Sequence, residues 1–328
     1  MKVLEKVKFN KLEKLNLNCN KISDINNLEN VNLKELKELD LSRNKISDIK
    51  VLEKVKFDNL EILYLNDNEI SDINNLENAN LKKLKELYLS WNKISDIKVL
   101  EKVKYDKLQK LNLSCNEISD INNLENVNLK ELKELDLSSN EISDIKVLEK
   151  VKFDKLEKLN LNNNGISDIN NLENANLKEL KELDLSVNKI SDIKVLEKVK
   201  FDKLEILDLS NNEISDIYNL ENANFKELKE LDLSFNEISD IKVLEKVKFG
   251  KIEILNLISN EISDINNLEN VNLKELKVLD LSFNKISDIK VLEKVKFDKL
   301  EKIYLYHNEI DIYKNGNFLI ITHKIIYN

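Results

Sequence analysis

Few residues of this 328-residue chain have the types and spacing that catalysis needs. The two histidines, His307 and His323, lie far along the chain from the two cysteines, Cys19 and Cys115. A catalytic nucleophile needs a base within hydrogen-bonding reach, and a zinc site needs closely spaced Cys and His ligands. Neither pattern occurs, and no glycine-rich phosphate loop is present among the three glycines. We therefore predict that the protein is not an enzyme and binds no cofactor and no metal.

The spacing that does recur in the sequence is that of asparagine. An asparagine returns at a constant interval, at positions 20, 44, 68, 92, 116, 140, 164, 188, 212, 236, 260, 284 and 308. Around Asn44 the unit reads Leu36-x-x-Leu39-x-Leu41-x-x-Asn44-x-Ile46-Ser47-Asp48-Ile49-x-x-Leu52. Fixed periods of about 20 to 50 residues are typical of solenoids and other repeat architectures. We therefore predict thirteen stacked repeats over residues 12–312.

Each repeat is expected to form a strand and then a turn or a helix. Residues 38–42 alternate polar residues with leucine, which is typical of a short strand with one buried face, and stacking would make a parallel sheet. Residues 50–57 are good helix formers, so the even repeats are predicted to carry a short helix capped by Ser47 or Asp48. Asparagine-rich residues 26–33 favour a looser turn or a 3₁₀ arc in the odd repeats. The true sequence unit is therefore a pair of repeats, one odd and one even.

One repeat cannot fold alone, because its apolar side chains contribute about 2 kcal/mol each on burial, against about 1 kcal/mol of backbone entropy for each residue. Stacking is predicted to bury Leu36, Leu39, Leu41, Ile46, Ile49, Leu52 and Phe57 and their equivalents. The landmark asparagine should bond the backbone of adjacent turns, since an unsatisfied buried amide costs about 1 to 3 kcal/mol. Recurring aspartates such as Asp24 and Asp72 are predicted to cap turns, with a column of bound cations as the alternative.

This pattern resembles the leucine-rich-repeat family over residues 12–312. The Asn-x-Ile-Ser-Asp-Ile-x-x-Leu segment at 44–52 is similar to bacterial internalin-like repeats and to those of the nuclear phosphatase-1 regulatory subunit. Those repeats usually have about 22 residues, so the repeats here are slightly longer. The resemblance implies an α/β solenoid with a curved parallel sheet on its concave face and short helices and 3₁₀ turns on its convex face. It also implies an asparagine ladder and protein binding on the concave face.

The two ends of the chain depart from the repeat. Residues 1–11 match the tail of an even repeat and are predicted to be a partial repeat. The first strand is then a free edge through which the protein could self-associate. Asn315-Gly316 lies between two apolar runs, which is a strong hairpin signal. We predict a β-type cap over residues 310–327, whose hairpin-like part forms the C-terminal segment 313–328.

The residue just before each landmark asparagine differs between copies, and we call these positions the variable column. It reads Cys19, Arg43, Asp67, Trp91, Cys115, Ser139, Asn163, Val187, Asn211, Phe235, Ser259, Phe283 and His307. We expect it at the solvent-facing end of the concave strand, where the family binds ligands, although neutral drift is the alternative. A second exposed column is not scrambled: it reads Glu13, Lys37, Glu61, Lys85, Gln109, Lys133, Glu157, Lys181, Glu205, Lys229, Glu253, Lys277 and Glu301. That alternation favours stacking, because opposite charges across adjacent strands attract.

Two patches on the concave face are predicted to bind a partner, because Trp, Tyr and Phe are common binding anchors. The N-terminal patch is Tyr64, Tyr88 and Trp91, and the C-terminal patch is Phe235, Ile258, Phe283, Tyr304 and Tyr306. Val187, also in the variable column, is predicted to contribute. Between the patches Asp184, Asp208 and Asp232 should stack on consecutive strands, with Asp280 two strands further on. These carboxylates are either a by-product of the repeated Leu-Asp-Leu-Ser segment or an acidic stripe for a basic partner.

Charge and composition narrow the class of partner and the compartment. A net charge of −9 disfavours nucleic acid and suits a protein partner, including a basic one. No run approaches the roughly 18 apolar residues of a membrane helix, so no membrane insertion is predicted. The charged N-terminus does not fit a secretory signal, and Cys19 and Cys115 should lie roughly 20 Å apart, too far to pair. These features favour a cytoplasmic or nuclear protein.

We therefore predict a protein–protein interaction module that serves as a scaffold or regulatory protein. One alternative is an exported or surface recognition protein of a microbe or parasite. The other is a structural spacer or self-assembling solenoid.

Overall fold

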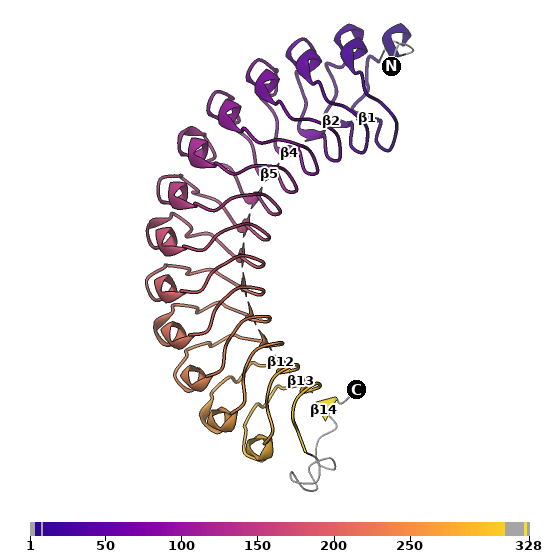
Figure 1. Ribbon diagram of the computed structural model, residues 1–328. Helices are drawn as coiled ribbons and strands as arrows, with labels where there is room; N and C mark the ends of the chain where they lie inside the picture. Colours follow the sequence, from indigo (N-terminus) through magenta and orange to yellow (C-terminus); the bar gives the residue numbers. More distant parts are fainter. Residues whose placement is uncertain (1–3, 8, 312–324, 327–328) are drawn as a thin grey trace. The chain divides into compact units, whose positions relative to one another are not determined.

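The structure, a computed structural model, describes residues 4–7, 9–311 and 325–326, and the chain forms two compact units. The first unit comprises residues 1–164 and 175–177, and the second comprises residues 165–174 and 178–328. Each unit is a stack of coils, with a short strand on one side of every coil and a 3₁₀ turn on the other (Figure 1). Within each unit the sheet lines the concave face.

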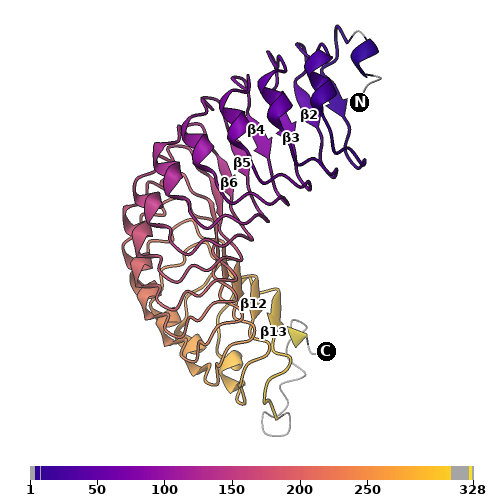
Figure 2. The same cartoon turned by 45° about the horizontal axis from the view of Figure 1, so that its top comes forward.

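The strands of each unit lie parallel and follow one another in chain order (Figure 2). In the first unit they are β1 (Lys14–Asn16), β2 (Glu38–Asp40), β3 (Ile62–Tyr64), β4 (Glu86–Tyr88), β5 (Lys110–Asn112), β6 (Glu134–Asp136) and β7 (Lys158–Asn160). In the second unit they are β8 (Glu182–Asp184), β9 (Ile206–Asp208), β10 (Glu230–Asp232), β11 (Ile254–Asn256), β12 (Val278–Asp280), β13 (Lys302–Tyr304) and β14 (Ile325–Ile326). Leu39 pairs with Leu63, its equivalent in the next repeat, so equivalent residues form columns across the sheet.

The turns on the convex side are all 3₁₀ helices in the described part of the chain. The first unit contains η1 (Leu4–Lys6), η2 (Asn26–Asn30), η3 (Lys50–Glu53), η4 (Asn74–Glu77), η5 (Lys98–Glu101), η6 (Asn122–Asn126) and η7 (Lys146–Glu149). The second contains η8 (Asn170–Asn174), η9 (Lys194–Glu197), η10 (Tyr218–Asn222), η11 (Lys242–Glu245), η12 (Asn266–Asn270) and η13 (Lys290–Glu293). The 3₁₀ arc predicted for the odd repeats is thus confirmed.

The short helix predicted for residues 50–57 of the even repeats is wrong. Only Lys50–Glu53 is helical, as a 3₁₀ turn, because Ile49 and Phe57 are both anchored in the core and leave room for one tight turn between them. A single turn also gains too few hydrogen bonds to nucleate an α-helix by propensity alone. Asp48 rather than Ser47 caps this turn, since its Oδ1 accepts the Lys50 N–H at 2.8 Å.

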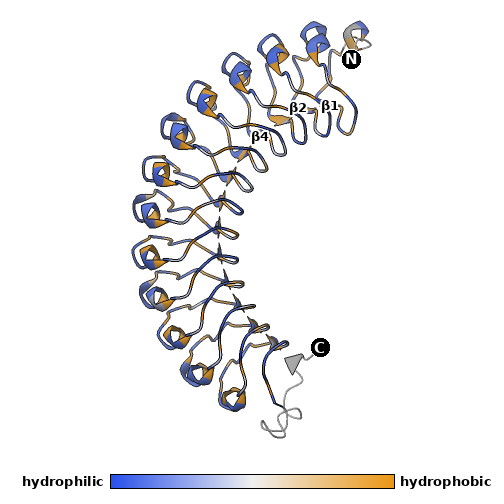
Figure 3. Cartoon of the chain, viewed as in Figure 1, coloured by the Kyte–Doolittle hydropathy of each residue, from blue (hydrophilic) through white to orange (hydrophobic). Residues whose placement is uncertain are grey.

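The core consists of the apolar columns that the sequence predicted, and apolar residues alternate with polar ones along every coil (Figure 3). Around the second landmark asparagine, Leu36, Leu39, Leu41, Ile46, Ile49, Leu52 and Phe57 are each at most 1% exposed. Tyr105 occupies the same place as Phe57 in a later repeat, and its buried hydroxyl has no hydrogen-bond partner among the described residues. Most odd repeats carry leucine at this place, as in Leu33 and Leu81, so the size of the core side chain varies within each pair of repeats.

The landmark asparagines form the predicted ladder, and Asn212 shows its geometry. Its Nδ2 donates to the carbonyl oxygens of Leu185 at 3.0 Å, Leu209 at 3.1 Å and Ser210 at 3.1 Å. Its Oδ1 accepts the N–H of Ile190 at 2.9 Å, so one side chain joins its own coil to the preceding one. The buried amide is satisfied on both sides, which explains why no other residue occupies these thirteen positions.

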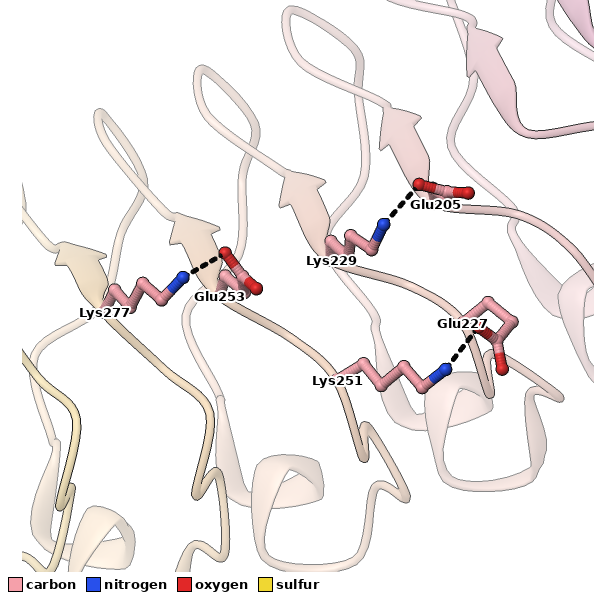
Figure 4. A network of polar contacts seen from close by, with 6 residues as sticks. All are labelled: Glu205, Glu227, Lys229, Lys251, Glu253 and Lys277. Carbon is pink, nitrogen blue, oxygen red and sulfur yellow. Dashed lines mark hydrogen bonds and ion pairs between the residues drawn. The ribbon is translucent and has the colours of Figure 1, made fainter.

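Ion pairs join adjacent coils on the surface, and most of them fall in three columns; Lys14–Glu38, Lys110–Glu134 and Lys285–Glu261 lie outside these. The predicted Glu/Lys alternation is confirmed: Lys229 contacts Glu205 at 2.5 Å and Lys277 contacts Glu253 at 2.6 Å (Figure 4). Two further columns were not predicted from the sequence. One joins 3₁₀ turns, as Lys54–Glu29, Lys102–Glu77, Lys150–Glu125, Lys198–Glu173, Lys246–Glu221 and Lys294–Glu269. The other precedes the strands, as Lys155–Glu131, Lys203–Glu179, Lys251–Glu227 and Lys299–Glu275.

These columns explain why the sequence pattern repeats in pairs. The first two columns join an odd repeat to the even repeat after it, as Lys229–Glu205 and Lys246–Glu221 do. The third column does the same, because Glu227 ends an odd repeat and Lys251 ends the even repeat after it when repeats are counted from residue 12. The two kinds of interface therefore carry different charge patterns.

The predicted C-terminal hairpin around Asn315-Gly316 lies outside the described residues. Within residues 313–328 only β14 is described, and it pairs in parallel with β13, through Ile303 with Ile325 and Tyr304 with Ile326. At the other end of the first unit, η1 packs beside η2.

Candidate binding surface

The variable column lies at the turn that follows each strand, and all thirteen residues adopt a left-handed backbone. Their φ angles lie between 52° and 56°. The N–H of Trp91 donates to the carbonyl oxygen of Ser114 in the next coil at 3.0 Å, and the positive φ then turns the chain so that Asn92 enters the ladder. A left-handed conformation favours Gly, Asn and Asp and is costly for β-branched residues such as Val187. No sequence signal indicated this backbone, because the column contains no glycine.

The column is exposed, as predicted, although Cys115, Ser139 and Ser259 are half-buried. Six large hydrophobic side chains are exposed in the described part of the chain: Val7, Trp91, Val187, Tyr218, Phe235 and Phe283. Four of these six belong to the variable column, with Trp91 65% and Phe235 52% exposed. Most of the large apolar side chains on the surface therefore lie at positions with a left-handed backbone, which is unfavourable for them.

The N-terminal patch brings its tyrosines together. The rings of Tyr64 and Tyr88 stack with centroids 4.8 Å apart and an angle of 11° between their planes. The Tyr88 hydroxyl donates to Glu86 Oε2 at 2.8 Å. Burial raises the pKa of both hydroxyls, and the Glu86 carboxylate raises them further, so both rings are neutral hydrogen-bond donors at physiological pH.

A hollow of about 680 Å³ lies at the strand ends of the first unit. It is lined by Asn18, Asp40, Ser42, Arg43, Asn66, Asp67, Ser90 and Trp91. Trp91 was predicted as a site residue from the sequence, whereas Arg43 and Asp67 were not. Their positions in the variable column placed them in neighbouring coils, but only the structure shows that they share one depression.

In the C-terminal patch, Phe283, Tyr304 and Tyr306 are in contact. Phe283 packs edge-on to Tyr306 with centroids 5.5 Å apart, and Tyr306 packs edge-on to Tyr304 at 6.3 Å. His307, which was not predicted as a site residue, stacks on Phe283 with ring centroids 4.3 Å apart. Phe235 and Ile258 lie on the preceding coils, and the Phe235 N–H donates to the Ile258 carbonyl oxygen at 2.8 Å.

Asp184, Asp208 and Asp232 stack in direct register, as predicted. The Oδ1 of each accepts the N–H two residues ahead, as in Asp208 with Ser210 at 2.9 Å. Asparagines in the same column do so too, as in Asn256 with Ile258 at 3.1 Å. Burial raises the pKa of Asp208, the neighbouring carboxylates add to this, and the Ser210 hydrogen bonds lower it. A turn-capping role therefore accounts for this column in every repeat where Asp or Asn occupies it.

The described residues contain no group of three or more His, Cys, Asp or Glu side chains that could hold a metal ion. No helix in the described part of the chain is long and apolar enough to cross a membrane.

The fold and this surface define a class, the repeat solenoids that present one strand and one variable residue per coil. The family of leucine-rich repeats, described as two-copy units, matches residues 9–54, 58–102, 106–150, 154–198, 178–222, 202–246 and 274–315. The chain therefore belongs to the leucine-rich-repeat family, whose fold mediates protein–protein interaction. A search of curated protein sequences found no significant match.

Solved structures agree with this assignment. An internalin of Listeria monocytogenes is 29% identical with a TM-score of 0.76, and the alignment covers 97% of this chain and 87% of the internalin. A leucine-rich-repeat protein of Leptospira interrogans is 26% identical with a TM-score of 0.74, covering 100% of this chain and 86% of that one. A plant peptide hormone receptor in complex with RGF2 shares the fold, at 21% identity, a TM-score of 0.65 and coverage of 90% and 48%. The predicted internalin-like repeats are thus confirmed.

Proposed function

We propose that this protein is an intracellular scaffold or regulatory subunit that binds a protein partner on the sheet face of its repeats. The variable column and the N-terminal and C-terminal patches form the binding surface. The partner surface is basic, because the protein carries a net charge of −9.

The observation that carries the proposal is the strained exposure of Trp91, Phe235 and Phe283. Each ring is exposed at a left-handed backbone position, so it costs stability twice without packing in the core. Drift among tolerated residues would favour Asn, Asp and Gly at such a backbone position. Rigid aromatic side chains retained there are explained by a partner that buries them.

The test is affinity capture from a lysate of the source organism. The bait is the native chain or a Trp91→Ala, Phe235→Ala, Phe283→Ala variant, and circular dichroism confirms that both are folded. Tyr218→Ala is the control, because Tyr218 is 46% exposed on a 3₁₀ turn rather than on the sheet face. We expect a protein partner that the native chain and the control retain and the triple variant loses. Equal recovery on all three baits would contradict sheet-face binding.

A second candidate function is recognition of a host molecule by an exported or surface protein of a microbe, and the likeness to an internalin favours it. Labelled protein applied to intact host cells tests this candidate. Binding that is lost in the triple variant supports it, and capture of partners from the source lysate alone contradicts it.

A further inference from the structure

The only arginine and the only tryptophan of this chain line the same hollow. Arg43 and Trp91 both belong to the variable column, two coils apart, and Asp67 lies on the coil between them. All other residues in the Lys and Arg count of the chain are lysines. The single arginine and the single tryptophan therefore lie at the same site, although the thirteen repeats are nearly identical.

The side chains of Arg43, Asp67 and Trp91 make no hydrogen bond or ion pair with any described residue. Asp40, which also lines the hollow, does. Asp40 at the floor accepts hydrogen bonds from Asn16 Nδ2 at 3.1 Å, Asn18 Nδ2 at 2.8 Å and the Ser42 N–H at 3.0 Å. The guanidinium of Arg43 and the carboxylate of Asp67 have no side-chain hydrogen bond or ion pair with any described residue, although they lie on adjacent coils. Both are exposed and available to a ligand.

Three different groups therefore follow one another on consecutive coils at the rim of the hollow: the cation of Arg43, the anion of Asp67 and the indole of Trp91. Adjacent strands are about 4.8 Å apart, so the rim spans about 10 Å from Arg43 to Trp91, or three residues of extended chain. Side chains on one face of an extended chain are two residues apart. A guanidinium pairs best with a carboxylate, and a cation that pairs with Asp67 can also lie over the indole.

We propose that this hollow binds an extended segment of the partner protein in which an acidic and a basic residue are two positions apart. The acidic side chain pairs with Arg43, and the basic side chain pairs with Asp67 while its alkyl stem and charge contact Trp91. This inference rests on the proposed sheet-face function and adds the chemistry of the partner at the first patch. A zwitterionic segment satisfies both rim charges, whereas a segment of one charge leaves one of them opposed by a like charge.

The test uses end-blocked peptides that contain Glu-x-Lys, Lys-x-Lys, Glu-x-Glu or Gln-x-Gln in an otherwise constant sequence. Trp91 is the only tryptophan, so its fluorescence reports binding at this hollow directly. We expect Glu-x-Lys to bind the native chain about five-fold more tightly than Gln-x-Gln, since two exposed ion pairs each contribute modestly. Lys-x-Lys and Glu-x-Glu should bind no better than Gln-x-Gln.

Charge reversal predicts a switch of preference rather than a loss. Arg43→Glu leaves two acids at the rim and should prefer Lys-x-Lys, and Asp67→Lys should prefer Glu-x-Glu. Lys130→Glu, an exposed residue outside the hollow, is the control for Arg43→Glu because it makes the same change in net charge and should keep the native preference.

The proposal is overturned if the native chain binds all four peptides equally, or none at millimolar concentration. It is also overturned if an oligosaccharide or single-stranded RNA changes Trp91 fluorescence where the peptides do not. Affinity capture with Trp91→Ala alone separates this failure from failure of the proposed function. A partner that still depends on Trp91 leaves sheet-face binding standing without this peptide chemistry.

Discussion

At the residue scale, the residues of the variable column differ in side chain but share a strained, left-handed backbone conformation. Thirteen residues other than glycine adopt φ angles near 54°, as Trp91 (55°), Phe235 (53°) and Arg43 (54°) do. The turn geometry imposes this conformation on every coil, because the next residue must enter the asparagine ladder. Strain of this kind is retained where a side chain has a function that outweighs the cost.

Val187 offers the clearest measure of that cost, because it is β-branched with φ at 53°. Asparagine tolerates the left-handed region and already occupies the column at Asn163 and Asn211. Val187→Asn is therefore expected to raise the free energy of unfolding by about 1 kcal/mol, measured by urea denaturation. The reciprocal change, Asn211→Val, should lower it by a similar amount. A Val187→Asn protein that is less stable than the native one would show that burial of the 41% exposed valine outweighs its strain.

At the element scale, each coil depends on side chains from its neighbour. Strands β1 to β13 are each three residues long, too short to hold a register by their own hydrogen bonds. The asparagine ladder adds side-chain bonds between coils at the point where the strand ends. The ion-pair columns add a charge pattern that differs between odd and even interfaces.

Loss of one ladder residue should be costly. Asn212→Ala removes the side-chain acceptor of the Ile190 N–H, in a region where Ile190 is 0% exposed, and leaves the Leu209 carbonyl with one donor fewer. We expect the free energy of unfolding to fall by about 3 kcal/mol in urea denaturation, since each unpaired buried group costs about 1 to 3 kcal/mol. Asn20→Ala is the control, because Asn20 is exposed and its amide donates within its own coil, to Leu17 and Asn18, and it should cost about 1 kcal/mol. Equal costs at the two sites would mean that the ladder contributes little beyond local turn formation.

At the scale of the whole molecule, the charge pattern makes the pair of repeats the unit of construction. Removal of residues 206–253, the paired deletion, takes out one pair of repeats and rejoins Glu205 to a coil whose neighbour presents Lys277. Removal of residues 206–229, the single deletion, takes out one repeat and places Glu205 beside Glu253 and Lys203 beside Lys251, whereas Glu197 takes the place of Glu221 beside Lys246. The single deletion keeps more of the core yet opposes like charges in two of the three columns, and it preserves an opposite-charge pair only between the 3₁₀ turns.

The two deletions should therefore respond to salt in opposite ways. Raising sodium chloride to about 1 M shortens the Debye length to about 3 Å, which screens exposed charges. We expect the urea midpoint of the single deletion to rise with salt, because repulsion is screened, and that of the paired deletion to stay level or fall. Parallel salt responses in the two proteins would show that the ion-pair columns do not set the period.

The sequence alone determined the parts of this protein that follow from periodicity. A constant spacing with apolar residues at fixed offsets dictates which side chains face inward, so Leu39, Ile46 and Phe57 were predictable as core and Asn44 as a ladder residue. The same periodicity identified the variable column, and with it Trp91, Phe235 and Phe283, as exposed. Charge alternation along one column predicted the Lys229–Glu205 pair, because neighbours in a column are neighbours in space.

The path of the backbone between the core and ladder residues was decided only by the tertiary structure. The short helix predicted at residues 50–57 became a 3₁₀ turn because the core anchors on either side leave space for one turn. The left-handed column arises from the way each coil meets its neighbour, which no propensity of Trp91 or Val187 encodes. Stacked coils place equivalent residues next to each other and turn their side chains to the same rim, which is why one hollow is lined by Arg43, Asp67 and Trp91. The sequence pattern records the spacing of these residues but not the direction of their side chains.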